Sequence, residues 1–116
     1  MKTIMVIGAG QMGSGIAQVC AQSGFQVYLN DMNETALNKG LKNIEKLLTR
    51  AVEKGRITDD QKTETLGRLT PSSDLQDAKN CDLVIEAVVE NMDVKTAVFK
   101  QLDDITPEHT ILASNT

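Results

Sequence analysis

The sequence predicts an α/β fold, a doubly wound parallel sheet with helices on both faces. Short apolar segments rich in β-branched residues alternate along the 116 residues with longer segments whose apolar residues recur every three or four positions. The first pattern is typical of strands buried on both faces, and the second is typical of amphipathic helices. Strands that alternate with helices pair in parallel through right-handed crossovers, which generates this fold.

The first half of the chain contains the clearest elements. Residues 3–7 (TIMVI) predict the first strand, and helical spacing from Gln11 predicts a helix that ends at Gly24 in a left-handed cap. Residues 25–30 predict a second strand, and residues 34–53 predict a long amphipathic helix. The expected inner face of the first helix consists of Gly13, Ile16, Ala17 and Cys20.

A second helix is expected directly after the long one. Gly55 provides the stop, and Thr58 to Gln61 has the form of a capping box that starts a helix running to about Gly67. Residues 34–67 therefore predict a helical hairpin with charged outer faces that protrudes from the sheet.

The second half predicts shorter elements. These are a strand at residues 69–72, a short helix after a second capping-box match at residues 73–76, a strand at residues 82–87, a helix capped by Asn91 and a strand at residues 110–113. Pro71 weakens the first of these strands, because proline cannot donate to a strand ladder.

Length and composition limit the classes of function. The length fits one domain. The net charge of −4 and the three scattered aromatic residues give neither a basic stripe nor a stacking platform, so we expect no nucleic-acid partner. No apolar run approaches the roughly 18 residues of a membrane span, and residues 1–10 lack a secretory signal, so we expect a cytoplasmic chain without membrane contact.

The two cysteines, Cys20 and Cys81, are far apart in the sequence, which indicates free thiols and no metal site.

A glycine cluster follows the first expected strand. Residues 8–13 (GAGQMG) fit G-x-G-x-x-G, a pattern that gains weight from its place between a strand and a helix. The first glycine permits a tight turn, the second lets the backbone approach a pyrophosphate, and the third lets the helix pack closely on the strand. We expect a Rossmann-type dinucleotide site that consists here of Gly8, Gly10, Gln11, Met12 and Gly13.

An acid stands where such a site needs one. Asp31 ends the second expected strand, 18 residues past Gly13, where a carboxylate accepts hydrogen bonds from the adenosine ribose. A carboxylate also repels the 2′-phosphate of NADP, and residues 30–33 contain no Arg or Lys, so the sequence favours NAD. Two alternatives stay open, namely a tight turn without a ligand, and FAD or a free nucleotide as the ligand.

Three segments carry a resemblance to a known family. Residues 6–18 (VIGAGQMGSGIAQ), 82–92 (DLVIEAVVENM) and 111–116 (ILASNT) are similar to the NAD-binding domain of the L-3-hydroxyacyl-CoA dehydrogenases, and the resemblance covers the whole chain. That family oxidises the 3-hydroxyl of an acyl-CoA and passes hydride to NAD. The resemblance implies that Glu90 and Lys95 contact the cofactor and that Lys54, on the hairpin, contacts CoA. The nearby serine of some members is Leu47 here.

The resemblance also implies that the catalytic residues stand outside this chain. The family uses a His-Glu pair, and His109 is the chain's single histidine and lacks the family's H-F-x-N-P surroundings, so we interpret it as a surface residue. We expect residues 1–116 to be the NAD-binding domain of a longer, homo-oligomeric dehydrogenase with a further helical domain, and to be inactive alone. A stand-alone NAD-binding module without catalysis stays open as an alternative.

Overall fold

The sheet contains five parallel strands in the order β3-β2-β1-β4-β5. The computed structural model describes residues 3–87 and 111–114. Its strands are β1 (Thr3–Ile7), β2 (Gln26–Asn30), β3 (Leu69–Ser72), β4 (Leu83–Glu86) and β5 (Ile111–Ser114). The chain builds the sheet outward from β1 to β3 and then returns to the other side of β1. The order of the strands therefore reverses between β1 and β4, which is where ligands of such sheets bind.

The predicted strands are confirmed within one residue at each end. β1 has the predicted bounds, β2 begins one residue later, β4 is one residue shorter at both ends, and β5 is shifted by one residue. Pro71 does not prevent β3, because β3 is an edge strand that pairs only with β2. An edge strand tolerates a residue that lacks a backbone N–H.

Three α-helices and one 3₁₀-helix connect the described strands. They are α1 (Gln11–Gln22), α2 (Glu34–Glu53), α3 (Asp59–Gly67) and η1 (Leu75–Asn80). The predicted glycine stops are confirmed, because Gly24 and Gly55 have φ values of +100° and +72°. The helix expected after Asn91 lies outside the described residues. Among those described, no helix is long and apolar enough to cross a membrane.

The second predicted capping box is wrong. Asp74, not Ser73, caps η1, and its carboxylate accepts a hydrogen bond from the Gln76 N–H at 2.9 Å. An aspartate that bonds to the amide two residues ahead makes an Asx-type turn. That turn forms one residue later than the box expected from Ser73 and leads into a tighter 3₁₀ segment.

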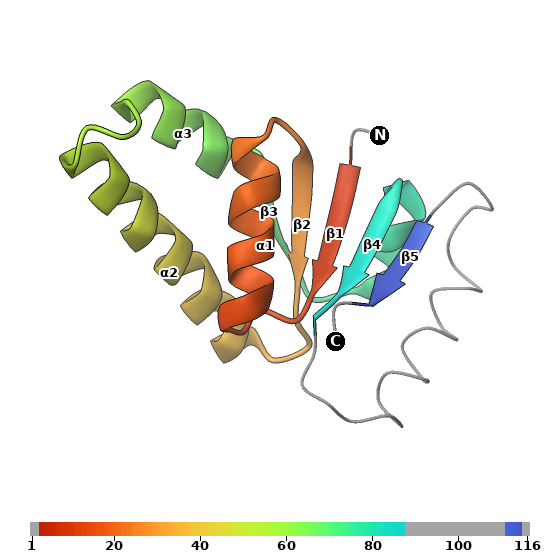
Figure 1. Cartoon of the computed structure of the whole chain (residues 1–116). Helices are drawn as coiled ribbons and strands as arrows, with labels where there is room; N and C mark the ends of the chain where they lie inside the picture. Colours follow the sequence, from red (N-terminus) through yellow and green to blue (C-terminus); the bar gives the residue numbers. More distant parts are fainter. Residues whose placement is uncertain (1–2, 88–110, 115–116) are drawn as a thin grey trace.

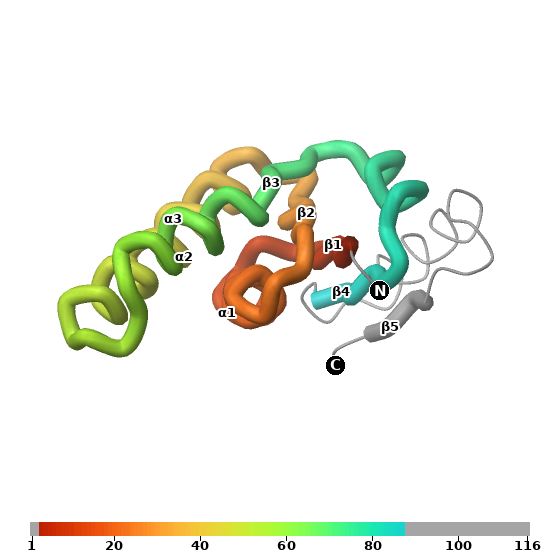
Figure 2. Tube along the Cα trace, turned by 90° about the horizontal axis from the view of Figure 1, so that it is seen from above, coloured from red at the N-terminus to blue at the C-terminus, as the bar shows by residue number. Residues whose placement is uncertain are grey.

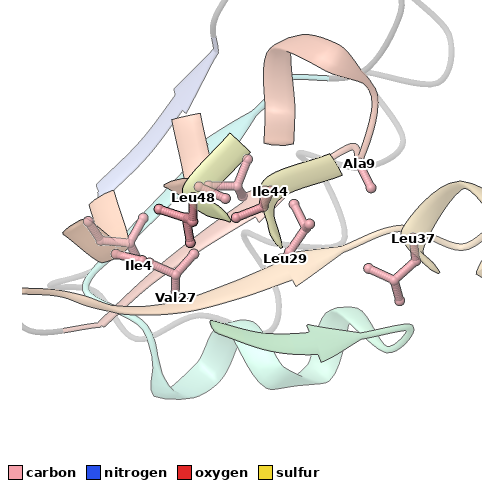
Figure 3. Packing of buried hydrophobic residues seen from close by; sticks show 10 residues of the cluster. Ile4, Ala9, Val27, Leu29, Leu37, Ile44 and Leu48 are labelled. Carbon is pink, nitrogen blue, oxygen red and sulfur yellow. The ribbon is translucent and has the colours of Figure 1, made fainter. Parts of the chain in front are cut away.

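Two apolar clusters cover the two faces of the sheet, as the fold class requires. β1 contributes Ile4 and Val6 to one cluster and Met5 and Ile7 to the other, because successive residues of a strand point to opposite faces. Figure 3 shows the first cluster, which α1 and α2 cover and which consists of Ile4, Val6, Ala9, Ala17, Ala21, Val27, Leu29, Leu37, Ile44 and Leu48. The second cluster is covered by η1 through Ala78.

The predicted inner face of α1 is only partly right. Gly13 and Ala17 are buried as expected, but the line continues through Ser14 and Ala21. Ile16 and Cys20 are only half-buried at its border. The small residues of the buried line let the helix axis lie close to the sheet, and this closeness moves the larger side chains to the flank.

The hairpin of α2 and α3 projects from the β3 side of the sheet, and its two helices diverge from the loop that joins them (Figure 1), although they overlap when viewed from above (Figure 2). α2 anchors it by burying Leu37, Ile44 and Leu48. Each such side chain stabilises the fold by roughly 1.5–3 kcal/mol when fully buried. α3 buries only Thr65, so its position depends more on polar contacts.

Two polar contacts hold α3. Both bonds of the predicted capping box are present: the Gln61 N–H donates to Thr58 Oγ1 at 3.1 Å, and the Thr58 N–H donates to Gln61 Oε1 at 2.9 Å. At the other end, the Arg68 guanidinium donates to the Ala21 carbonyl at 2.9 Å. This carbonyl lies in the last turn of α1, where a positive charge is favourable.

We expect Thr58→Ala to lower the free energy of unfolding by about 1 kcal/mol, because it removes the N-cap side chain of α3. Urea unfolding followed by circular dichroism measures the change. Thr63→Ala is the matched control, since the Thr63 hydroxyl only donates to the Asp59 carbonyl within the same helix. An equal loss in both variants would contradict a specific contribution of the cap.

Candidate dinucleotide-binding site

The turn after β1 requires a glycine. Gly8 has a φ of +103°, in the left-handed region that other residues rarely adopt. Its N–H donates to the Asn30 carbonyl at 2.7 Å, so the contact between β1 and β2 continues one residue past the strands. The backbone then turns towards α1 at the carboxyl edge of the sheet, as the glycine pattern predicts.

The other two glycines of the cluster differ in their surroundings: Gly13 is packed against backbone, and Gly10 is open to solvent. A Cβ on Gly13 would overlap the carbonyl oxygen of Gly8, so only glycine lets α1 approach the turn this closely. A Cβ on Gly10 would meet nothing within 4 Å. One glycine thus permits internal packing, and the other leaves an exposed stretch of bare backbone that fits a ligand.

The amino end of α1 has no side-chain cap. Gly10 is the N-cap, no side chain caps the helix, and its first turn contains no acidic residue. The Ser14 N–H makes the hydrogen bond to the Gly10 carbonyl, at 2.9 Å. The amide groups before it and the helix dipole favour an anion such as a phosphate at this end.

Asp31 lies beside the glycine turn and binds it directly. Its Oδ2 accepts a hydrogen bond from the Ala9 N–H, and its Oδ1 accepts one from the Asn33 N–H, both at 2.9 Å. The side chain is only half-buried, and a carboxylate oxygen can accept more than one hydrogen bond. Asp31 therefore keeps acceptor capacity that the predicted ribose contact requires, and it also holds the turn in place, which the sequence did not indicate.

Sequence reasoning missed two residues that support the turn. A Cβ on Gly40 of α2 would lie 2.6 Å from the Ala9 carbonyl oxygen and 2.8 Å from Ser14 Oγ. Ser14, buried in α1, donates its hydroxyl to the same carbonyl at 3.0 Å. The available signal was a glycine on the apolar stripe of a helix, between Leu37 and Ile44, which indicates close packing.

Polar side chains lie at the carboxyl ends of β2 and β4, on the face of the sheet that the second apolar cluster covers. Asn30 and Glu86 flank Ile7 in the strand register, and both are buried. Asn30 Nδ2 donates to Ser72 Oγ at 3.1 Å, but Asn30 Oδ1 has no hydrogen-bond partner. A buried acceptor without a partner at this edge fits a donor that comes from outside the described protein atoms.

Burial disfavours ionisation of both cysteine thiols. Both are free thiols, as predicted. Burial, with smaller contributions from Asp82 and Asp77, raises the pKa of Cys81 to about 11, and burial also raises the pKa of Cys20. A thiol must ionise to attack a carbon or to bind a metal. Within residues 3–87 and 111–114, no group of three or more His, Cys, Asp or Glu side chains could hold a metal ion.

The other predicted site residues lie away from the glycine turn or outside the described part. Lys54 is exposed at the C-cap of α2. It stands 14 residues beyond Gly40, about 21 Å along the helix at 1.5 Å per residue. Glu90, Lys95 and His109 lie outside the described residues. The structure therefore brings together Gly8, Gly10, Gln11, Met12, Gly13 and Asp31, but does not join Lys54 to them.

Comparisons with known proteins show the family of the chain. Residues 3–116 match the family model described as "3-hydroxyacyl-CoA dehydrogenase, NAD binding domain". A probable 3-hydroxybutyryl-CoA dehydrogenase of Bacillus subtilis is 52% identical over 116 residues, which are 100% of this chain and 40% of that protein. One of Deinococcus radiodurans is 54% identical over 111 residues, covering 96% of this chain and 40% of that protein.

Solved structures give the same result. The (S)-3-hydroxybutyryl-CoA dehydrogenase of Ralstonia eutropha aligns with a TM-score of 0.96 and 40% identity over 100% of this chain and 41% of the other. The 3-hydroxybutyryl-CoA dehydrogenase of Escherichia coli K12 aligns with a TM-score of 0.96 and 42% identity, over 99% of this chain and 24% of that one. The chain thus spans about two fifths of the curated relatives named above. It belongs to the family of NAD-binding domains of the 3-hydroxyacyl-CoA dehydrogenases.

Proposed function

We propose that this chain is the cofactor-binding part of an enzyme that moves hydride between NAD and carbon 3 of a 3-hydroxyacyl or 3-ketoacyl group on CoA. The observation that carries the proposal is the family match over residues 3–116, on a chain whose glycine turn leaves bare backbone beside an uncapped helix end. Relatives named 3-hydroxybutyryl-CoA dehydrogenase support a short-chain acyl-CoA as the substrate.

The residues of the turn have separate tasks in this proposal. When bound, NAD supplies the carbon that accepts or releases hydride. The backbone at Gly10, Gln11 and Met12 binds the diphosphate, and Gly8 and Gly13 permit the conformation that presents this backbone. Asp31 accepts hydrogen bonds from the adenosine ribose and disfavours a 2′-phosphate by charge repulsion.

Three further contacts complete the proposed binding surface. Glu90 and Lys95 contact the cofactor, and Lys54 contacts a phosphate of CoA, for which a lysine ammonium is a suitable partner. Leu47 offers no hydroxyl at the position where some family members have serine, so Lys54 acts there without that partner. Acyl-CoA thus binds through the hairpin, together with a part of the protein outside this chain.

The proposed enzyme is longer than this chain. Since the chain covers 40% of the Bacillus subtilis relative, residues 1–116 are proposed as one NAD-binding domain with its hairpin at about residues 34–67. The general base, its orienting glutamate and the dimerisation surface then belong to the remaining part. We propose that the whole protein is a cytoplasmic homo-oligomer.

We expect Asp31→Ala to weaken NADH binding by about 1–3 kcal/mol, because a hydrogen-bonding carboxylate is lost, and to weaken NADPH binding less. Isothermal titration calorimetry of the purified chain measures both ligands. Asp60→Ala, which removes an exposed acid of α3, is the matched control. Unchanged NADH binding by Asp31→Ala would remove Asp31 from the proposed site.

Substitutions of Gly13 and Gly15, both in α1, distinguish the effect of close packing from the effect of helix propensity. We expect Gly13→Ala to destabilise the chain by about 1–3 kcal/mol, as overpacking does, and to abolish detectable NADH binding. Gly15→Ala meets open space and should stabilise the chain by up to about 1 kcal/mol through helix propensity. Urea unfolding and NADH titration test both variants. Equal effects at the two positions would show that the close contact of Gly13 is unimportant.

The proposed activity requires the longer protein. We expect residues 1–116 to bind NADH without oxidising it in the presence of acetoacetyl-CoA, and the protein that extends beyond Thr116 to oxidise it. Absorbance at 340 nm follows the reaction. Turnover by residues 1–116 would contradict our assignment of catalysis to the remaining part. A longer protein that binds NADH but never turns over acyl-CoA would instead favour a binding module without catalysis.

A further inference from the structure

Ser72 lies directly beside the segment that contains Asp31. It is the last residue of β3, it is buried, and its register partner on β2 is Asn30, the residue before Asp31. One residue past the end of β2, the Asp31 N–H donates to the Ser72 carbonyl at 3.1 Å. The backbone of the proposed ribose-binding acid is therefore held by a residue of the edge strand.

A chain of side-chain hydrogen bonds passes through Ser72. Asn30 Nδ2 donates to Ser72 Oγ at 3.1 Å. The Ser72 hydroxyl in turn donates to Asp77 Oδ2 at 2.8 Å, and the Asp74 carbonyl offers a second acceptor at 3.0 Å. A hydrogen bond to a carboxylate is roughly twice as strong as one between neutral groups. The chain of bonds thus connects β2, β3 and η1 at the carboxyl edge of the sheet.

This corner of the sheet depends on the Ser72 hydroxyl. β3 has four residues, pairs only with β2 and contains Pro71, which lacks a backbone N–H. In the described part of the chain, Asn30 Oδ1 has no hydrogen-bond partner. Without the hydroxyl, both ends of the buried Asn30 amide would be unpaired, which is costly. Loss of the hydroxyl should therefore move residues 30 and 72 rather than leave them in place.

Asn30 connects this network to the glycine turn. Its carbonyl accepts the Gly8 N–H at 2.7 Å, and its side chain bonds to Ser72 on the other side. Asp31, the next residue, binds the Ala9 N–H through Oδ2. The position of the Asp31 carboxylate is therefore set from two directions, by the turn and by Ser72.

We propose that Ser72 is a positioning residue for the choice of cofactor, because its hydroxyl and carbonyl hold Asp31 where a ribose 2′-hydroxyl can reach the carboxylate. The inference rests on the proposed function, in which Asp31 binds the adenosine ribose of NAD. Hydrogen bonds weaken steeply with misalignment, whereas the repulsion between two charges falls only with the inverse of their distance. A small displacement of Asp31 therefore weakens NADH binding and leaves the repulsion of the 2′-phosphate of NADPH nearly unchanged.

Ser72→Ala tests the inference in two backgrounds. In the parent chain, we expect at least about threefold weaker NADH binding, near the lower end of the coupling within one hydrogen-bond network, and NADPH binding within about twofold of the parent. In the Asp31→Ala background, we expect no further loss of NADH binding, because the acid through which Ser72 acts is absent. Calorimetric titration with NADH and NADPH measures each variant.

Thr65→Val is the matched control. It removes a buried hydroxyl of α3 that donates to the Gln61 carbonyl of the same helix, so we expect it to bind NADH as the parent chain does. If Ser72→Ala does not fold, Asp77→Ala takes its place. That variant keeps the Ser72 hydroxyl but removes its charged acceptor, and we expect the same pattern of binding.

The pattern of losses distinguishes a positioning role from a structural one. Equal losses of NADH and NADPH binding, or the same loss of NADH binding with and without Asp31, would overturn the inference, because a general destabilisation of the fold produces both results. NADH binding by Ser72→Ala equal to that of Thr65→Val would overturn it too. If Asp31→Ala still weakens NADH binding in that case, only this inference fails. A parent chain that binds no NADH contradicts the proposed function, and the inference fails with it.

Discussion

The approach of α1 to the carbonyl of Gly8 is the constraint on which the rest of the site depends. The contact excludes any Cβ at Gly13 and therefore fixes the helix against the turn. Ser14, the next residue, is then placed to donate to the Ala9 carbonyl, and Gly40 of α2 packs on the same carbonyl. Both helices thus contact the Ala9 carbonyl, two residues past the end of β1, so the position of the hairpin follows from the position of the turn.

Capping distinguishes α1 from the other described helices. Asn33, Thr58 and Asp74 cap α2, α3 and η1 with side-chain oxygens, whereas Gly10 offers α1 no side chain. Glycine as an N-cap costs only a few tenths of a kcal/mol relative to Ser, Thr, Asn or Asp. The small loss leaves the amino end of α1 without a side-chain oxygen over its first amides. The helix without a side-chain cap, α1, is the one whose amino end borders the candidate site.

Periodicity and glycine chemistry predicted most of the fold, because these features are local. Every described strand and α-helix follows from residues of the element and its immediate flanks, and these flanks include the stops at Gly24 and Gly55. The errors have two causes: the border of α1 depends on contacts with other parts of the chain, whereas the cap of η1 depends on a choice between two adjacent polar residues. The contact between Gly13 and Gly8 moves Ile16 and Cys20 to the border of α1, and the Asx turn of Asp74 displaces the expected cap at Ser73. The role of Gly40 depends on a partner 31 residues away, Ala9, and no local pattern names that partner.

Asp31 connects the geometry of the turn with the binding role that we propose for it. A carboxylate placed only for a ribose would be held by its own rotamer preferences and would lose side-chain entropy when the ligand arrives. Here the bonds from the Ala9 and Asn33 amides fix both oxygens before any ligand binds, so most of that loss occurs during folding. The same bonds neutralise part of the cost of a half-buried charge. An amide side chain at position 31 can accept through only one oxygen, so it cannot hold the turn and the following loop in the same way. An acid at this position therefore fixes the shape of the turn, in addition to the role in the choice between NAD and NADP that we propose for it.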